Sequence, residues 1–316
     1  MTTTSAPTTD GFPPVRADER PDLLAPGSPA HRVLAEPLIA LYGLPGFLLP
    51  LMHPATAEAT LRRDPVFTNP DSHLMHFAAR LRDTIEMIAG VGLAGEEADH
   101  VAFAMRELHK PIKGRDTRGE PYHAWTRDIW TWNWAAIVAG FMSMYGGVRG
   151  FPSREFRDDA YLGLVETGRR FGVLGMPASY DEFLVVWPLE RDRIADPDNE
   201  TIQRVLALTQ ARGLPAPTWL RRLPLPLWAV ATLPIRHFLR MSLLLGLSPE
   251  ERAMLGFRER PTDRAAARLH RLVWRIGLPR PVSYRLGLAW MAGRSRWGQP
   301  VWRTRFSAAA LGADRG

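Results

Sequence analysis

A histidine and an arginine share one face of a helix that the sequence predicts over Glu96–Ile112. At about 100° per residue, the apolar stripe of this segment is centred on His109, and Arg106 lies at the edge of the stripe on the same side. An inward imidazole can bind a metal ion. It can equally be a core side chain that hydrogen-bonds a backbone carbonyl, and the spacing alone leaves both interpretations open.

An arginine and a threonine form a second pair, on the helix predicted over Asp71–Ala89. Arg80 and Thr84 are four residues apart and therefore stack on one flank of that helix. Asp83 points away from the apolar stripe, so we expect it to be solvated. The Arg80–Thr84 pair can line a pocket or can be an ordinary surface contact.

The composition limits which other side chains can do chemistry. The 316 residues include no cysteine, which excludes disulfides, Fe–S clusters, thiolate catalysis and zinc sites built on cysteine. Any metal or cofactor ligand must therefore come from histidines, carboxylates, tyrosines, threonines or arginines. Hydrophobic residues make up 46% and charged residues 23% of the chain, as in soluble globular proteins with a sizeable core.

The net charge of +7 conceals a division into an acidic and a basic part. Residues 201–316 contain 20 Arg, no Lys and five acidic residues, so they carry +15 and leave −8 on residues 1–200. The basic part can face nucleic acid, anionic lipid or an acidic ligand. It can also pair with the acidic part inside the fold, and composition does not decide between these alternatives.

Helical periodicity covers nearly the whole chain, and alternating β-branched runs are nearly absent. The sequence therefore predicts an all-α fold of about a dozen helices packed in the style of a globin. The expected helices span Pro29–Tyr42, His53–Arg63, Asp71–Ala89, Glu96–Ile112, Ala124–Met144, Ser153–Phe171, Tyr180–Asp192, Glu200–Gln210, Leu225–Leu245, Pro249–Phe257, Thr262–Ile276 and Val282–Arg296.

The predicted organisation is a single helical domain with a tail at each end. Residues 1–22 are rich in Thr, Pro and Asp and are expected to be a disordered tail, residues 23–300 the domain, and residues 301–316 a C-terminal tail. The start of the chain does not resemble a signal peptide. Prolines and arginines interrupt the most apolar stretches before they reach the roughly 20 residues of a membrane helix. We therefore expect a cytoplasmic protein.

Two further patterns have ordinary explanations. Gly90-Val-Gly92-Leu-Ala-Gly95 matches the dinucleotide-binding pattern, but it follows an amphipathic helix instead of a strand. We interpret it as a helix C-cap, a turn and the start of the next helix. His73 and His76 have a spacing that suits a metal ion, but no carboxylate partner is evident, so we do not expect a metal there.

A succession of short motifs runs along the chain in a characteristic order. The motifs are Ala25-Pro26-Gly27-Ser28, Leu51-Met52-His53-Pro54, Arg80-x-x-x-Thr84, Arg106-x-x-His109-x-x-x-x-Gly114, Gly119-x-x-Tyr122-x-Ala124 and Asp128-x-Trp130. Together they resemble the oxygenase family of latex-clearing proteins and MpaB-type enzymes, over roughly Pro26 to Leu245. The resemblance implies a single all-helical domain that binds haem b, with a histidine as the proximal ligand of the iron.

The same resemblance implies roles for individual residues. His109 matches the proximal iron ligand, Arg106 the arginine of the haem pocket beside it, and Arg80 and Thr84 the pocket residues of the preceding helix. His53 belongs to the pattern through His53-Pro54, and it either supports the pocket or ends a loop.

One position departs from the family pattern. In latex-clearing proteins a lysine directly before the threonine can occupy the distal iron position, and here that residue is Asp83. A lysine ligand is therefore excluded, which leaves the sixth position open or filled by water or another group. Rubber cleavage is accordingly not implied as the specific reaction. For the catalytic acid, Asp64 is a candidate by distance alone.

These observations predict a haem b-dependent oxygenase that uses O2 on an apolar small molecule. Arginines would hold the haem propionates, and some of the 11 tryptophans could line a lipophilic tunnel, although most tryptophans are core residues. No nucleic-acid partner is expected, and peripheral membrane contact is compatible with this function. The alternative is a non-enzymatic helical protein whose Arg-rich C-terminal half binds lipid or nucleic acid. A third possibility is a haem protein that uses peroxide or rearranges its substrate.

Overall fold

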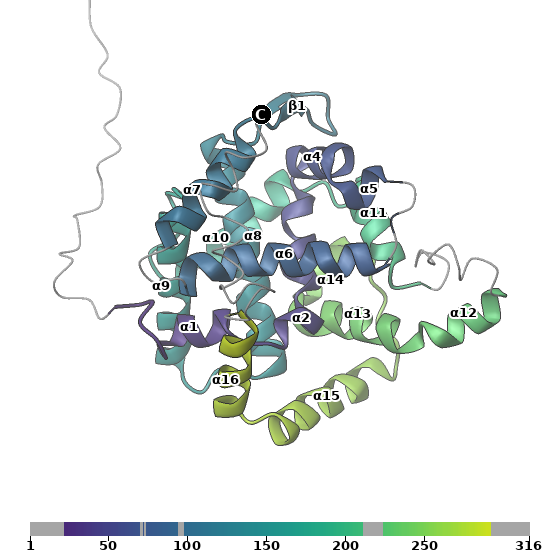
Figure 1. The fold of residues 1–316 in the computed structure, drawn as a ribbon. Coiled ribbons are helices and arrows are strands. Elements are labelled where there is room, and N and C mark those ends of the chain that lie inside the picture. The colour runs from purple at the N-terminus through teal and green to yellow at the C-terminus, as the bar shows by residue number, and fades with distance from the viewer. Residues whose placement is uncertain (1–21, 70–71, 73, 94–97, 211–223, 292–316) are drawn as a thin grey trace, which may run out of the picture.

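Helices pack around one another to form nearly all of the structure, as the sequence predicts (Figure 1). The computed structural model describes residues 22–69, 72, 74–93, 98–210 and 224–291. The predicted tails therefore lie outside the described residues, except for residue 22, and so does His73. Within the described residues, no helix is long and apolar enough to cross a membrane.

The first half of the chain supplies short helices, two long ones and a hairpin. Its elements are α1 (Pro29–Leu34), α2 (Ile39–Tyr42), α3 (Leu44–Leu48), the 3-10 helix η1 (Pro50–Met52), α4 (Pro54–Arg63), α5 (Pro65–Thr68), α6 (Leu74–Leu93), α7 (Ala98–His109), β1 (Lys113–Arg115), β2 (Pro121–His123) and α8 (Arg127–Val148). The remaining elements are α9 (Arg154–Arg170), α10 (Tyr180–Ile194), α11 (Glu200–Ala207), α12 (Leu225–Ala231), α13 (Leu233–Gly246), α14 (Pro249–Met254), α15 (Asp263–Gly277) and α16 (Arg280–Met291).

The apolar helix α8 lies at the centre and contacts α1, α3, α9 and α13. A glycine permits its closest approach to α3, because a Cβ on Gly140 would lie 2.4 Å from the Cα of Gly46. Most of the buried side chains of α8 belong to the main hydrophobic core. Helix α8 supplies one wall of the site described below.

The glycine pattern between α6 and α7 has a packing role. Gly90 and Gly92 lie inside α6, which continues to Leu93, so the expected C-cap at this place is wrong. A Cβ on Gly92 would lie 2.2 Å from a methyl group of Leu34, so the glycine lets α1 pack closely on α6. Gly95 lies outside the described residues. Because a helix precedes the pattern, a dinucleotide-binding unit is not formed here.

Prolines divide two of the predicted helices. The helix expected over Pro29–Tyr42 is broken between α1 and α2, where Pro37 lies. The helix expected over Leu225–Leu245 is split at Thr232, two residues before Pro234. Both breaks follow from the missing N–H of proline and its clash with the preceding turn.

A small antiparallel hairpin follows α7, and the helical pattern did not predict it. β1 pairs with β2 in the register Lys113↔His123, Gly114↔Tyr122 and Arg115↔Pro121. Gly119, with a φ of +85°, makes the turn possible. The hairpin carries Tyr122 back toward α4.

A buried ion pair ties the C-terminal helices to the start of the chain. Arg149, which is 1% exposed, donates from Nε to Glu36 Oε2 at 3.0 Å. Its Nη1 donates to the carbonyls of Trp274 and Leu278 at 2.7 and 2.6 Å, and its Nη2 donates to Ser283 Oγ at 2.5 Å. One guanidinium thus fixes the end of α15 and the start of α16.

Candidate functional site

Helices α4, α6, α7 and α8 surround two adjoining cavities, which we call the outer and the inner cavity. The outer cavity has a volume of about 550 Å³ and the inner cavity about 160 Å³, so the outer one alone is within the usual range for ligand pockets. The residues that line both are Thr56, Thr60, Arg80, Met87, Met105, His109 and Asn133. Two of the predicted site residues, His109 and Arg80, are therefore at the junction.

The imidazole of His109 is held in a defined orientation at the end of α7. Its Nδ1 lies 2.8 Å from the carbonyl oxygen of Met105, and its ring meets the Trp130 ring edge to face at 5.0 Å between centroids. Because a carbonyl only accepts, Nδ1 carries the hydrogen and Nε2 keeps its lone pair. Burial lowers the pKa of His109, and the positive charge of Arg80 lowers it further against the opposing effect of the Met105 carbonyl. His109 is therefore a neutral imidazole with one free ligand atom.

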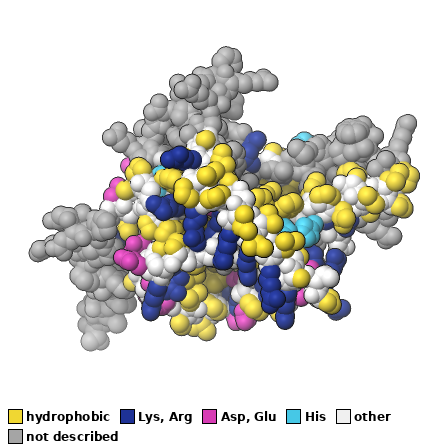
Figure 2. Space-filling view, turned by 90° about the horizontal axis from the view of Figure 1, so that it is seen from below, with side chains coloured by type: hydrophobic (Ala, Val, Ile, Leu, Met, Phe, Trp, Pro, Cys, Tyr) yellow, Lys and Arg dark blue, Asp and Glu magenta, His cyan; other side chains and the backbone are white. Residues whose placement is uncertain are grey.

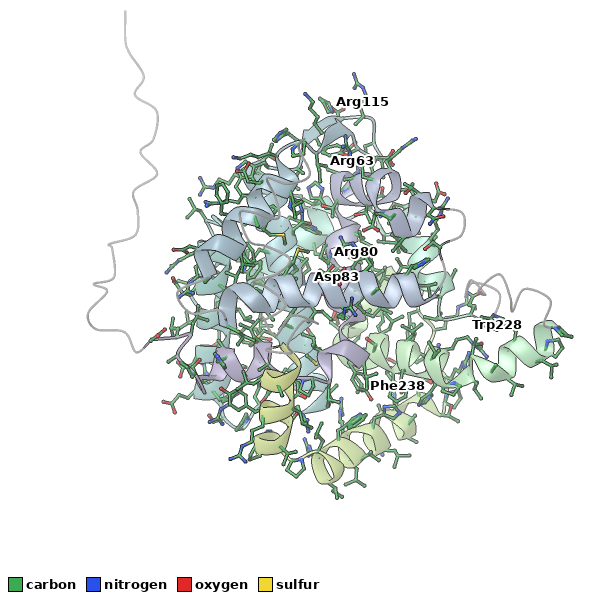
Figure 3. The ribbon with its side chains drawn as sticks, in the orientation of Figure 1. Arg63, Arg80, Asp83, Arg115, Trp228 and Phe238 are labelled. Carbon is green, nitrogen blue, oxygen red and sulfur yellow. The ribbon has the colours of Figure 1, made fainter. Side chains whose placement is uncertain are left out.

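Arg80, which Figure 3 labels at α6, joins this helix to the carboxylate that precedes α5. Its Nε donates to Asp64 Oδ2 at 2.5 Å, and its Nη1 donates to the hydroxyl of Thr84 one turn later. Asp64 is only 8% exposed, and its other oxygen accepts from the Val66 N–H at 3.0 Å. Thr84 also donates to the Arg80 carbonyl at 3.0 Å. The predicted pair and the candidate acid thus form one hydrogen-bonded array.

The two cavities differ in polarity. Thr84 lines the inner cavity, whereas Asp64 and Asp83 line the outer one. The inner cavity is otherwise walled mainly by apolar side chains: Phe47, Leu51, Ile88, Trp130, Trp134, Ile137, Phe171 and Val173. The indole N–H groups of Trp130 and Trp134 both donate to backbone carbonyls at 3.1 Å. This wall therefore presents carbon atoms, with its indole donors already satisfied.

A polar contact between α4 and α8 was missed by reasoning from the sequence. Thr56 Oγ1 donates to Asn133 Oδ1 at 2.9 Å, and both side chains line both cavities. Asn133 is flanked by Trp132 and Trp134 in an otherwise apolar helix. An amide in such a helix is a signal that could have identified it. Tyr122, which the hairpin places on the outer cavity, belongs to the motif Gly119-x-x-Tyr122-x-Ala124, but the sequence analysis assigned it no role.

Two residues named by the motifs, Arg106 and His53, lie outside the walls of both cavities, and for His53 this matches the second of its two expected roles. Arg106 lines neither cavity, and its guanidinium lies 5.9 Å from the ring centre of Phe103. His53 caps α4, with Nδ1 accepting from the Ala55 N–H at 3.1 Å, and lines neither cavity. Burial lowers the pKa of His53 to about 4. Asp83, labelled at α6 in Figure 3, is not simply solvated, because it borders the outer cavity and pairs with Arg82 at 3.1 Å.

A further cavity of about 330 Å³ lies between α8 and α10. Trp132, Phe183 and Trp187 form much of its wall, and Arg127 and Glu190 are among its charged residues. No histidine is among its lining residues, so it offers no imidazole ligand. Within the described part of the chain, no cluster of three or more His, Asp or Glu side chains is arranged to hold a metal ion.

The fold and cavities define an all-α domain with a buried pocket that contains one oriented, neutral histidine. A family model described as "ER-bound oxygenase mpaB/B'/Rubber oxygenase, catalytic domain" matches residues 31–310. The chain therefore belongs to this family of oxygenase catalytic domains, and the resemblance inferred from the motifs is confirmed. No curated protein and no solved structure matches the chain.

Proposed function

We propose that the protein is a haem b-dependent oxygenase in which His109 would bind the iron of the haem. The observation that carries this proposal is the orientation of His109, which lines both cavities with Nδ1 bound to the Met105 carbonyl. A porphyrin supplies four of the iron ligands, so a single neutral imidazole is a sufficient protein ligand. The lowered pKa of His109 supports the role, because a protonated ring cannot bind a metal.

The residues of the outer cavity fit the polar edge of a haem. Arg63 and Arg80 both line it, and a guanidinium is well suited to bind a propionate carboxylate. Arg80 is already engaged by the carboxylate of Asp64. Exposed Arg63 has only neutral partners among the described residues, the Lys113 carbonyl at 3.0 Å from Nη2 and the side chain of Tyr122. We therefore assign Arg63 the propionate contact and Arg80 a role nearer the reacting atoms. Arg106 and His53 have no direct contact in this proposal.

The proposed substrate is an apolar small molecule, which the aromatic and aliphatic wall of the inner cavity would bind. When bound, the haem supplies the chemistry of O2 binding and oxidation. The protein excludes water with side chains such as Phe171, which is 1% exposed, and fixes the ligand geometry through Met105. Asp64 is the proposed proton acceptor or donor, and Arg80 positions its Oδ2.

The residue directly before Thr84 distinguishes this chain from latex-clearing proteins. Asp83 stands where those proteins can have a ligating lysine, and it borders the outer cavity. We propose that no side chain at position 83 would bind the haem iron. The match to oxygenase domains favours this function over a non-enzymatic helical protein. The cytoplasmic location stays a prediction from the sequence.

Absorption spectroscopy tests the cofactor. The full chain, expressed with a haem precursor and purified, is expected to be red-brown, with a Soret band and about one haem per chain. A folded but colourless protein that does not take up added haemin would contradict the proposal.

Isotope labelling tests the reaction. Turnover of an apolar substrate under labelled O2 is expected to place the label in the product. If the haem protein oxidises its substrate without incorporating label from O2, the oxygenase reaction is wrong even though the cofactor is right.

A further inference from the structure

Helix α15 is fixed to the protein along one face. Ala267, His270 and Trp274 recur at helical spacing on that face, and the first is buried. His270 Nδ1 and Trp274 Nε1 lie 2.5 and 2.7 Å from the hydroxyl oxygen of Tyr42 in α2. With the carbonyl of Trp274 also held by Arg149, the rotation of α15 about its axis is set.

A second face of α15 consists of aliphatic side chains in solvent, which we call the α15 apolar stripe. Its members are Leu269, Leu272, Val273 and Ile276, which are 58%, 54%, 49% and 71% exposed. Their spacing of i, i+3, i+4 and i+7 puts them on one side of the helix. An aliphatic row of this kind is unusual on a surface that faces only water, because grouped apolar side chains mark an interaction site.

Between these two faces runs a row of arginines, which we call the α15 arginine stripe. It consists of Arg264, Arg268, Arg271 and Arg275, and all four side chains are exposed. Arg264 meets Glu259 at 3.5 Å, and Arg271 donates to the Gly147 carbonyl at 2.6 Å. Among the described residues, no carboxylate forms a salt bridge with Arg268, Arg271 or Arg275. Their charge therefore remains available at the surface.

Neighbouring elements extend both features. Figure 2 looks at the side of the molecule on which α15 and α16 lie, and hydrophobic and basic side chains intermingle across it while acidic ones are few. Helix α16 adds exposed Arg280 and Arg285, together with Val282 and Leu286, which are 47% and 51% exposed. Residues 264–291 contain six Arg and no acidic residue. The face is thus both apolar and uniformly positive.

We propose that this face docks on the surface of a bilayer that contains anionic lipid. The α15 apolar stripe enters the boundary between headgroups and acyl chains, and the α15 arginine stripe binds lipid phosphates, as in other interfacial helices. Guanidinium groups pair well with phosphate oxygens. The proposal is independent of the haem, because neither stripe contributes a residue to the outer or inner cavity.

Two other occupants fit the face less well. A symmetric contact with a second copy of the chain would bring the same arginine-rich surface of both molecules together, and like charges repel. Nucleic acid would satisfy the arginines, but it would leave aliphatic side chains such as Leu272 and Ile276 without an apolar partner. Only a lipid surface supplies anionic and apolar groups in adjacent layers.

Vesicle flotation with the full chain tests the proposal. We expect binding to phosphatidylcholine vesicles that contain phosphatidylglycerol, little binding to phosphatidylcholine alone, and weaker binding as NaCl rises from about 0.05 to about 0.5 M. Ile276→Glu should lower the partition coefficient about tenfold or more, and Arg268→Gln with Arg275→Gln should weaken the preference for anionic vesicles.

Two matched sets of substitutions at exposed residues outside α15 and α16 serve as controls. Leu189→Glu changes a side chain of α10 that is 66% exposed, and Lys113→Gln with Arg115→Gln removes two charges from β1. Both controls should bind vesicles as the wild type does. The proposal is wrong if wild-type protein ignores anionic vesicles, or if Ile276→Glu and Leu189→Glu behave alike. Preferential binding to DNA, or self-association without vesicle binding, would also overturn it.

Discussion

The arginines of the cavity region and those of the α15 face differ in their partners and in their exposure to solvent. Arg80, on α6, is held by the nearly buried carboxylate of Asp64 and by Thr84, and it lines a pocket. Arg268 and Arg275, on α15, are exposed, and no carboxylate in the described part of the chain pairs with them. The same residue type therefore serves an internal site in one region and an external surface in the other, and the partners reveal which.

The ion pairs of the basic part show how the charge asymmetry of the chain is arranged in the structure. Arg240 pairs with Asp263, while Arg252 and Arg264 pair with Glu259, so these ion pairs stay within the basic part. One of the two alternatives was that the arginines of the basic part pair with carboxylates of the acidic part. In the α15 arginine stripe, no arginine forms an ion pair with a described carboxylate of the acidic part. The acidic and the basic part are instead connected through Arg149. This residue pairs with Glu36 inside the acidic part and also binds α15 and α16 of the basic part.

Removing the charge of Glu36 should have the largest effect on stability. Glu36→Gln leaves the Arg149 guanidinium buried without its ionic partner, which is expected to cost about 3–5 kcal/mol of the free energy of unfolding. Urea unfolding measures this loss. The control is Glu200→Gln, which breaks an exposed pair with Arg204 and should cost less than about 1 kcal/mol. Equal losses in both variants would show that Arg149 does not join the two regions.

Acid should destabilise the protein through the buried imidazole of His53, the N-cap of α4. The pKa of His53 is about 4 in the folded chain, below the usual value near 6.5, so the unfolded chain binds this proton first as the pH falls. Stability is therefore lost between about pH 6.5 and about pH 4, by at most about 3 kcal/mol from this group.

His53→Asn sharpens that measurement, because asparagine can still cap α4 while it does not titrate. The difference in urea midpoint between about pH 7.5 and about pH 4.5 should be smaller in the variant than in the wild type. An unchanged difference would mean that protonation of His53 does not cause the loss of stability in acid.

Substituting an arginine should affect activity in one region only. Arg80→Ala is expected to lower turnover of an apolar substrate while changing stability by about 1 kcal/mol, since its side chain is partly exposed. Arg268→Ala should leave turnover and stability unchanged. Full activity of Arg80→Ala, measured beside Arg268→Ala at equal haem content, would remove Arg80 from the proposed site.

The smallest effect is expected at Thr84. Thr84→Ala removes the hydroxyl that accepts from Arg80, so turnover should fall less than in Arg80→Ala, and stability should change by less than about 1 kcal/mol. Thr131→Ala, which removes an exposed hydroxyl bonded to the Leu174 carbonyl, is the matched control and should keep full turnover. A larger loss in Thr84→Ala than in Arg80→Ala would reverse the order of importance proposed for the array.

Periodicity predicted those parts of the site that lie on a single helix. The inward position of His109 and the stacking of Arg80 on Thr84 follow from spacing within α7 and α6. The same reasoning placed Arg106 beside the pocket, where it does not lie, because a position at the edge of a stripe does not determine the direction of a long, flexible side chain.

Helical periodicity could not predict contacts between segments that are distant in the sequence. Thr56 and Asn133 meet across 77 residues of sequence, and Tyr122 reaches the outer cavity through a hairpin that helical periodicity does not indicate. The order of the motifs identified the family correctly, as the match of the family model to residues 31–310 shows. The α15 apolar stripe was missed because hydrophobic periodicity shows that a helix has an apolar face but does not show whether that face is buried or exposed.

The absorption spectrum of His109→Ala tests the central proposal most directly. The variant is expected to lose the wild-type Soret band and its bound haem, and to become less stable by about 1–3 kcal/mol as the core closes over the missing ring. Circular dichroism should show that it remains helical, and His123→Ala, which alters a half-buried histidine of β2, should keep the wild-type spectrum. A wild-type Soret band in folded His109→Ala would contradict the assignment of His109 as the axial ligand.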